Sequence, residues 1–112
     1  MGATRVQFGN SIDYTPGSAV DGGDVVVLAE LVAVAEVDIA ANTLGALAVT
    51  GIFDFNKTAG GGSAIAAGDV VFYDVAEGVA KEDAEAGANK RIGFCVASAA
   101  DAATSVRCLL SQ

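Results

Sequence analysis

Apolar and polar residues alternate along segment 24–39, "DVVVLAELVAVAEVDI". Every second residue from Val25 onward is apolar, whereas the acidic residues Glu30, Glu36 and Asp38 lie in the other row. A period of two with many β-branched valines is typical of strands. We therefore predict a pair of strands with a break near Glu30, in preference to one helix.

Comparable runs recur along the rest of the chain, separated by turns rich in Gly, Ala and Asp. They are "ALAVTGIFDF" (46–55), "DVVFYDV" (69–75), "RIGFCVAS" (91–98) and "TSVRCLLS" (104–111). Frequent short strands of this kind indicate an all-β sandwich or barrel. We expect one small domain of about seven to eight short strands over residues 24–112. Residues 1–23, which are mixed and polar, are predicted to form an N-terminal extended arm.

The last two runs predict a hairpin whose register follows from their apolar rows. Directing both rows toward one core places Phe94 opposite Cys108, and Cys95 on the other face opposite Arg107. A slip of one residue would pair the two cysteines but would place Arg107 opposite an apolar core position, Val96. The sequence therefore predicts two free thiols on opposite faces of the sheet, each acting as a small buried hydrophobe.

Composition and charge indicate which classes of partner the protein can bind. The 112 residues are 53% hydrophobic, more than one small core requires, which favours self-association. The net charge is −8, with 14 acidic residues against 6 Lys and Arg. Nucleic-acid binding requires clustered cations, and only Lys90 and Arg91 are adjacent, so we expect no nucleic-acid partner.

Neither a membrane span nor an export signal is expected. The most apolar stretch, 25–37, contains Glu30 and Glu36 and is shorter than the roughly 20 apolar residues that a span needs. The start of the chain, "MGATRVQFGNS", lacks the apolar run of a signal peptide. These features predict synthesis in a cytoplasm and no membrane contact.

The residues that usually carry catalysis are scarce. The chain has no histidine, so Ser-His and Cys-His nucleophile pairs and His-based zinc sites are excluded. Lys57-Thr58 precede Gly60-Gly61-Gly62, which reverses the order of a phosphate-binding loop, and a strand follows instead of a helix. This stretch is better explained as a flexible connector. The acidic residues are expected in turns and on a solvated face. We predict no catalytic residue, cofactor or metal, and no enzymatic activity.

Several short motifs follow one another along the chain: Gly51-Ile52-Phe53, Lys57, Ala66-Ala67-Gly68-Asp69, the strand 71–74 and the segments 89–94 and 106–110. The order and spacing of these motifs resemble those of a family of phage capsid cement or decoration proteins. The resemblance covers about residues 23–110. Asn56 stands where the family commonly has proline, and the arm matches loosely.

The resemblance implies a β-rich virion protein on the outer surface of an assembled phage head, stabilising it against internal DNA pressure. Its partners would be the major capsid protein of a tailed phage and further copies of itself, with a trimer favoured over a dimer. Val6, Phe8 and Tyr14 of the arm, together with Lys57, are the predicted partner-binding residues, because aromatic anchors in extended segments bury much area. Packing of the arm aromatics on their own domain is the alternative for those residues.

Two other functions stay open at this point. One is a different structural role in the virion, such as a head fibre base, a tail component or a minor coat protein. The other is a β-rich ligand-binding module, which the absence of tryptophan disfavours because sugars stack on aromatic rings.

Overall fold

A computed structural model describes residues 2–4 and 9–111 of the chain. The described residues form nine strands and one 3-10 turn, which confirms the predicted all-β fold. The strands are β1 (Ser11–Tyr14), β2 (Val25–Leu28), β3 (Leu31–Val34), β4 (Gly45–Ala48), β5 (Gly51–Asn56), β6 (Val70–Asp74), β7 (Val79–Lys81), β8 (Lys90–Ala97) and β9 (Ser105–Leu110). The 3-10 turn, η1, is Glu85–Gly87.

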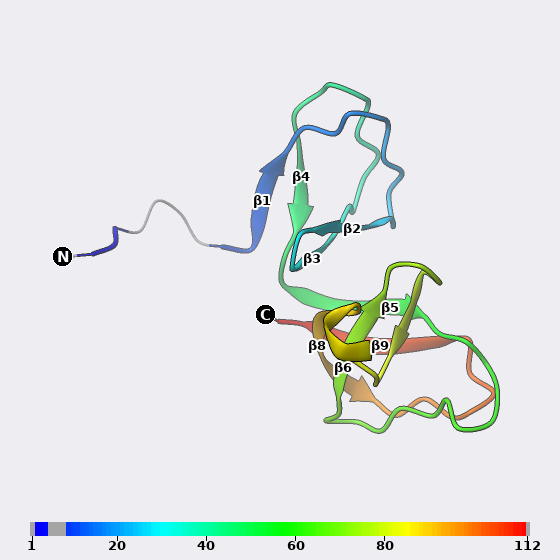
Figure 1. The fold of residues 1–112 in the computed structure, drawn as a ribbon. Helices are drawn as coiled ribbons and strands as arrows, with labels where there is room; N and C mark the ends of the chain where they lie inside the picture. The colour runs from blue at the N-terminus through cyan, green and yellow to red at the C-terminus, as the bar shows by residue number, and fades with distance from the viewer. Residues whose placement is uncertain (1, 5–8, 112) are drawn as a thin grey trace.

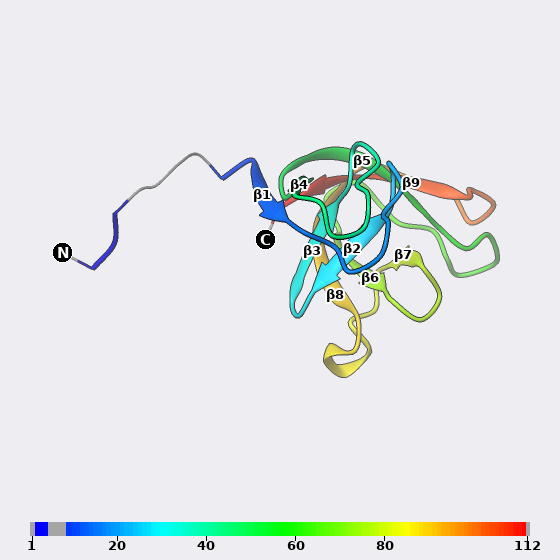
Figure 2. The ribbon, with the colours of Figure 1, turned by 90° about the horizontal axis from the view of Figure 1, so that it is seen from above.

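The strands form two antiparallel sheets that pack together. The four-stranded sheet has the order β1-β4-β3-β2 and the five-stranded sheet has the order β5-β9-β8-β6-β7. Figure 1 shows the four-stranded sheet above the five-stranded one, and Figure 2 shows β2 and β3 lying over β6 and β8. The break predicted near Glu30 is confirmed, because β2 and β3 form a hairpin in which Leu28 is opposite Leu31.

The main core lies between the sheets. Val32 and Val34 of β3 contact it from one side, and the inner face of the five-stranded sheet supplies most of the rest. Its other buried members are Phe55, Ile65, Val71, Ala80, Ile92, Cys95, Ala99, Val106, Cys108 and Leu110. The edge strands β5 and β7 also contact each other, and the rings of Phe55 and Tyr73 lie 6.4 Å apart. The five-stranded sheet is therefore strongly curled, with its concave side filled by the core.

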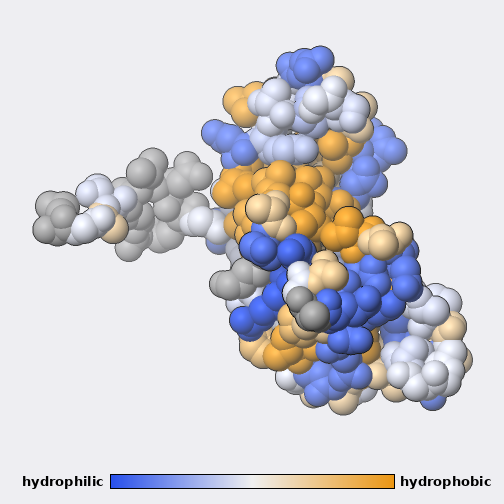
Figure 3. All heavy atoms as spheres, viewed as in Figure 1, coloured by the Kyte–Doolittle hydropathy of each residue, from blue (hydrophilic) through white to orange (hydrophobic). Residues whose placement is uncertain are grey.

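A second, smaller cluster lies on the opposite face of the four-stranded sheet. Its buried members are Ala33, Ala35, Ile39 and Leu47. Strand β3 is thus buried on both faces, which explains why it carries no polar residue. Figure 3 shows hydrophobic residues at the surface over the strands of this sheet, so the second cluster is partly open to solvent.

Part of the predicted arm belongs to the four-stranded sheet. Strand β1 pairs with β4, with Ser11 opposite Ala48, and Val20 forms a bridge with Ile39. The extended piece predicted around residues 6–8 lies outside the described residues. The division of the chain at residue 23 stays a prediction.

The predicted register of the final hairpin is wrong. Cys95 lies opposite Cys108, and Phe94 lies opposite Leu109. The register shifts between Cys95 and Ala97, and Ala97 lies opposite Arg107. Val96 is therefore the extra residue of a β-bulge, which lets the thiols pair without placing Arg107 beside the core. Both thiols are free, but both lie on the inner face.

Candidate interaction surfaces

Lys57 follows β5 directly and is buried, with 5% of its surface exposed. Its Nζ atom donates hydrogen bonds to the carbonyl oxygens of Thr58 (3.1 Å), Asp101 (3.4 Å) and Ala103 (3.2 Å) and to Ser63 Oγ (3.0 Å). A buried ammonium requires such acceptors, since an unpartnered one is costly. Lys57 thus ties the connector after β5 to the turn between β8 and β9. Its predicted role in binding a partner stays a prediction.

The glycine-rich connector is held to the same turn by its backbone. The Asp101 carboxylate accepts hydrogen bonds from the amides of Ser63 (3.1 Å) and Ala64 (2.9 Å), and the Gly60 amide donates to the Asp101 carbonyl (2.7 Å). Gly62 has φ +80°, a conformation that favours glycine. These three amides, which a phosphate-binding loop would direct at a ligand, are used within the chain.

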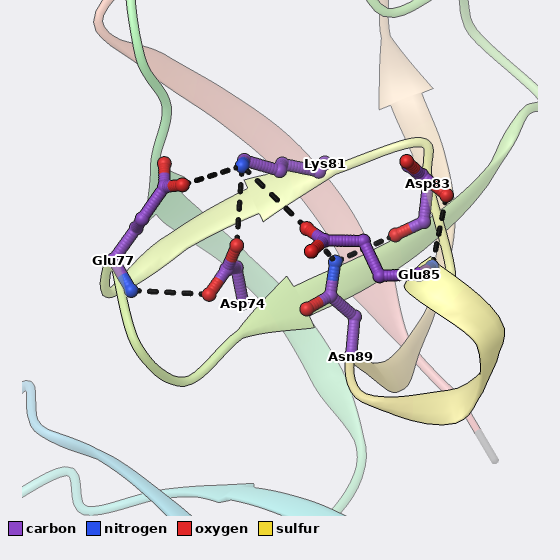
Figure 4. A network of polar contacts seen from close by, with 6 residues as sticks. All are labelled: Asp74, Glu77, Lys81, Asp83, Glu85 and Asn89. Carbon is purple, nitrogen blue, oxygen red and sulfur yellow. Dashed lines mark hydrogen bonds and ion pairs between the residues drawn. The ribbon is translucent and has the colours of Figure 1, made fainter.

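A surface hollow of about 310 Å³ lies between this connector and β7. Its lining residues are Lys57, Thr58, Gly62, Ser63, Ile65, Glu77, Ala80, Lys81, Glu82 and Asp83. Lys81, on its rim, is surrounded by carboxylates: its Nζ lies 2.9 Å from Glu77, 3.1 Å from Asp74 and 3.7 Å from Glu85 (Figure 4). The hydrogen bonds that Lys81 donates to Glu77 and Asp74 raise the pKa of Lys81, against a smaller opposing effect of burial.

Asp74 and Asn89 extend this network into the body of the protein, and each is only 5% exposed. Asp74 accepts a hydrogen bond from the Glu77 amide (3.1 Å), which, with Lys81, lowers the pKa of Asp74. Asn89 Nδ2 donates to the Asp83 carbonyl (2.7 Å) and to Glu85 (3.0 Å), as Figure 4 shows. The network joins β6, β7 and η1, and each of its side chains has a polar partner inside the chain. Within the described residues no group of three or more His, Cys, Asp or Glu is placed to hold a metal ion.

Tyr14, the other described member of the predicted binding set, is half-buried and packs against the second cluster. It therefore makes the contact with its own domain that was the alternative for the arm aromatics. Tyr14 lies on β1 and Lys57 directly follows β5, a strand of the other sheet, and the structure does not bring the two residues together in one site. Val6 and Phe8 lie outside the described residues, so their predicted contacts stay predictions.

Sequence reasoning missed an apolar band on the outer face of the five-stranded sheet. The band follows directly from the strand register: Ile52 lies opposite Leu109, Leu109 opposite Phe94, and Phe94 opposite Val70. Ile52 is 61% exposed and Val70 is 38% exposed, whereas the two central residues are half-buried. The available signal was the pair Ile52-Phe53, which places an apolar residue on each face of β5.

Two arginines border this band and differ in their partners. Arg107 forms a two-point ion pair with Asp54 on the neighbouring strand, at 2.9 and 3.2 Å. The pair lowers the pKa of Asp54 and raises that of Arg107. Arg91 instead lies over the ring of Phe94, with its guanidinium carbon 5.1 Å from the ring centre. Among the described residues, Arg91 is exposed and has no carboxylate partner.

Comparison with known families identifies the chain as a whole. Residues 6–110 match the phage cement protein family, a span that includes all nine strands of both sheets. The chain belongs to the phage cement protein family. No curated protein and no solved structure matches it.

Membership of this family indicates the role of the protein and the kind of partner that its surfaces meet. A cement protein is a structural component of the virion that stabilises the capsid, and its partners are phage capsid proteins. This confirms the function expected from the sequence. In the described part of the chain, no helix is long and apolar enough to cross a membrane.

Proposed function

We propose that this protein binds the outer surface of an assembled phage head and stabilises the shell against the pressure of packaged DNA. The observation that carries the proposal is the family match, which extends over residues 6–110 and so over the whole fold. The net charge of −8 supports an outward position, because an acidic protein is repelled by the DNA inside the shell.

The mechanism is preferential binding. A protein that binds the assembled, expanded shell but not the free subunits shifts the equilibrium toward the shell by mass action. No group transfer is involved, and the proposal includes no enzymatic step. The partner is the major capsid protein of a tailed phage, and the protein is synthesised in the host cytoplasm before it reaches the virion.

We also propose that the protein acts as a homo-oligomer, with a trimer favoured because three copies suit threefold junctions of a shell. Apolar residues make up 53% of the chain, and Val37 and Leu44 are each 67% exposed, which supports burial between copies. Light scattering of the purified protein measures its mass directly. A monomeric mass over the whole accessible concentration range would contradict this part of the proposal.

Val6, Phe8, Tyr14 and Lys57 remain the proposed partner-binding residues. For Lys57 the supporting geometry is indirect, because its amine holds two loops together and so shapes the surface that they present. For the other three, the support is their apolar or aromatic character at the start of the chain. The double substitution Val6→Ser and Phe8→Ser is expected to weaken binding to shells, and circular dichroism of the free protein checks that the variant is folded.

The test of the proposed function uses phage shells that lack this protein. Purified protein is mixed with expanded shells, unexpanded shells and free capsid subunits, and each mixture is sedimented. We expect co-sedimentation with expanded shells and a rise in their melting temperature. If the protein neither sediments with expanded shells nor stabilises them, the proposed function is wrong.

A further inference from the structure

The outer face of the five-stranded sheet combines features that favour a contact with another surface. Its apolar band crosses four adjacent strands, from Ile52 on β5 through Leu109 and Phe94 to Val70 on β6. The opposite face of the same sheet already packs on the main core. Exposed apolar residues that adjoin one another, unlike scattered ones, mark interaction sites.

We propose that this band, with Arg91, docks into an apolar groove bordered by a carboxylate on the assembled phage shell. The inference rests on the proposed function and adds to it the face of the protein that meets the shell and the chemistry of the partner surface. Three observations favour this occupant: the charge of Arg91, the curvature of the sheet and the size of the band.

The charge of Arg91 indicates an acidic group on the partner. Of the cations on the described residues, Lys81, Lys90 and Arg107 are paired with carboxylates, and Lys57 is buried among hydrogen-bond acceptors. Arg91 has neither, and the Phe94 ring orients its guanidinium beside the band. A planar guanidinium that is stacked on an aromatic ring keeps its edge free for a two-point contact with a carboxylate.

The curvature of the sheet disfavours a second copy of this chain at the same face. Contact between the edge strands β5 and β7 makes the sheet curl around the core, so its outer face is convex. Two identical convex faces touch only along a narrow line, whereas a convex band fits a groove. In a two-fold pairing of this face with itself, Arg91 would also approach the same region of an identical chain, including the other Arg91.

The size of the band also favours the phage shell as its partner. Four neighbouring strands span about 14 Å at the usual strand spacing. A stable complex of two chains buries about 800 Å² on each partner, far more than such a band supplies. The band therefore suits one of several contacts that act together, as on a shell that a bound oligomer touches at more than one point.

The experiment measures co-sedimentation of variants with expanded shells that lack this protein. Ile52→Ser removes an exposed apolar side chain from the band, and Val75→Ser removes one of similar exposure outside the band, in the turn between β6 and β7 (61% and 54%). Arg91→Gln removes the unpaired charge. Lys90→Gln removes one charge from the adjacent residue of the same strand, whose amine is paired with Glu30 at 2.9 Å.

We expect Ile52→Ser and Arg91→Gln each to weaken shell binding about tenfold or more, and the two matched controls to stay within about twofold of the unmodified protein. Binding of the unmodified protein should also fall with added salt, and less so for Arg91→Gln. Circular dichroism and urea unfolding of each variant confirm that it is folded. Because Arg91 is exposed, its variant keeps the test valid even where a second variant is unstable.

The outcomes separate the inference from the proposed function. If the unmodified protein binds shells and both band variants bind equally well, or if the controls lose as much, the docking face is wrong while the proposed function stands. If the unmodified protein does not bind shells, the proposed function fails first. If Ile52→Ser changes the mass of the free protein in light scattering, the band is an interface between copies and the docking inference is overturned.

Discussion

Cys95 on β8 and Cys108 on β9 lie directly opposite each other on the inner face of the five-stranded sheet, and both thiols are free. They are 2% and 0% exposed, so each acts as a small apolar residue of the main core. The bulge at Val96 makes this pairing compatible with an exposed Arg107 on the next outward position. Burial, with smaller effects of Cys95 and Asp54, raises the pKa of Cys108 to about 12.

This pKa predicts a loss of stability at high pH. An unfolded thiol ionises near 9.0, whereas the folded Cys108 keeps its proton to about pH 12. Above pH 9 the unfolded state therefore binds fewer protons than the folded state, and the free energy of unfolding falls as pH rises. The slope from this one group is at most about 1.4 kcal/mol per pH unit. Urea unfolding between pH 8 and pH 11 should show a shallower slope for Cys108→Ala; equal slopes would contradict the assignment.

Lys57→Met is predicted to destabilise the protein by about 3 kcal/mol, because its loss leaves buried acceptors of the connector and of the Asp101 turn without a donor. The matched control is Lys90→Met, whose amine pairs with the exposed Glu30, and it should cost less than about 1 kcal/mol. Urea unfolding monitored by circular dichroism measures both. Equal losses of stability for the two variants would show that the buried hydrogen bonds of Lys57 stabilise the protein no more than the exposed ion pair of Lys90 does.

The sequence predicted the strand content because the alternation of apolar residues is a local signal. The hairpin of β2 and β3 could be placed from 24–39 alone, including its break near Glu30. The run 46–55 predicts one strand, yet it covers most of both β4 and β5, which belong to different sheets. No local signal in the sequence shows that the chain leaves one sheet after β4 and enters the other at Thr50-Gly51. Gly51 adopts φ +131° there.

The register of β8 and β9 could not be derived from apolar rows because a bulge breaks the period of two. With Val96 as an extra residue, the rows before and after it point to opposite faces, and a uniform alternation predicts the wrong partner for Cys95. A second irregularity, between the pairs Val71–Gly93 and Phe72–Arg91, puts Phe94 on the outer face although Ile92 lies in the core, and it hid the outer band. The sequence predicts Lys57 as a partner-binding residue and gives no sign of its burial, because that burial depends on Asp101 and Ala103, more than forty residues away.

The polar network around Lys81 predicts a response to acid. The hydrogen bond from the Glu77 amide, then the one from Lys81, lowers the pKa of Asp74 below its ordinary 3.8. The folded state therefore releases this proton more readily than the unfolded state. The stabilising effect is complete above about pH 4 and is lost as pH falls through the lowered pKa. Asp74→Asn should unfold more easily at pH 7 and depend less on pH below 4; a steeper dependence in the variant would contradict this.

Among substitutions that add a single methyl group, Gly93→Ala is predicted to reduce stability most. A Cβ atom at this position of β8 would lie 2.1 Å from the Leu109 carbonyl oxygen, and its φ of +152° is one that other residues rarely adopt. Gly93→Ala must therefore displace β9 from its position beside the central strand β8, and we expect a loss of stability of at least about 3 kcal/mol. Gly61→Ala is the control, since it has open space and no positive φ, and it should leave stability unchanged or raise it by about 0.5 kcal/mol. Thermal unfolding of both variants tests the β8–β9 geometry on which the outer band depends: an unimpaired Gly93→Ala protein would show that this pairing is misplaced.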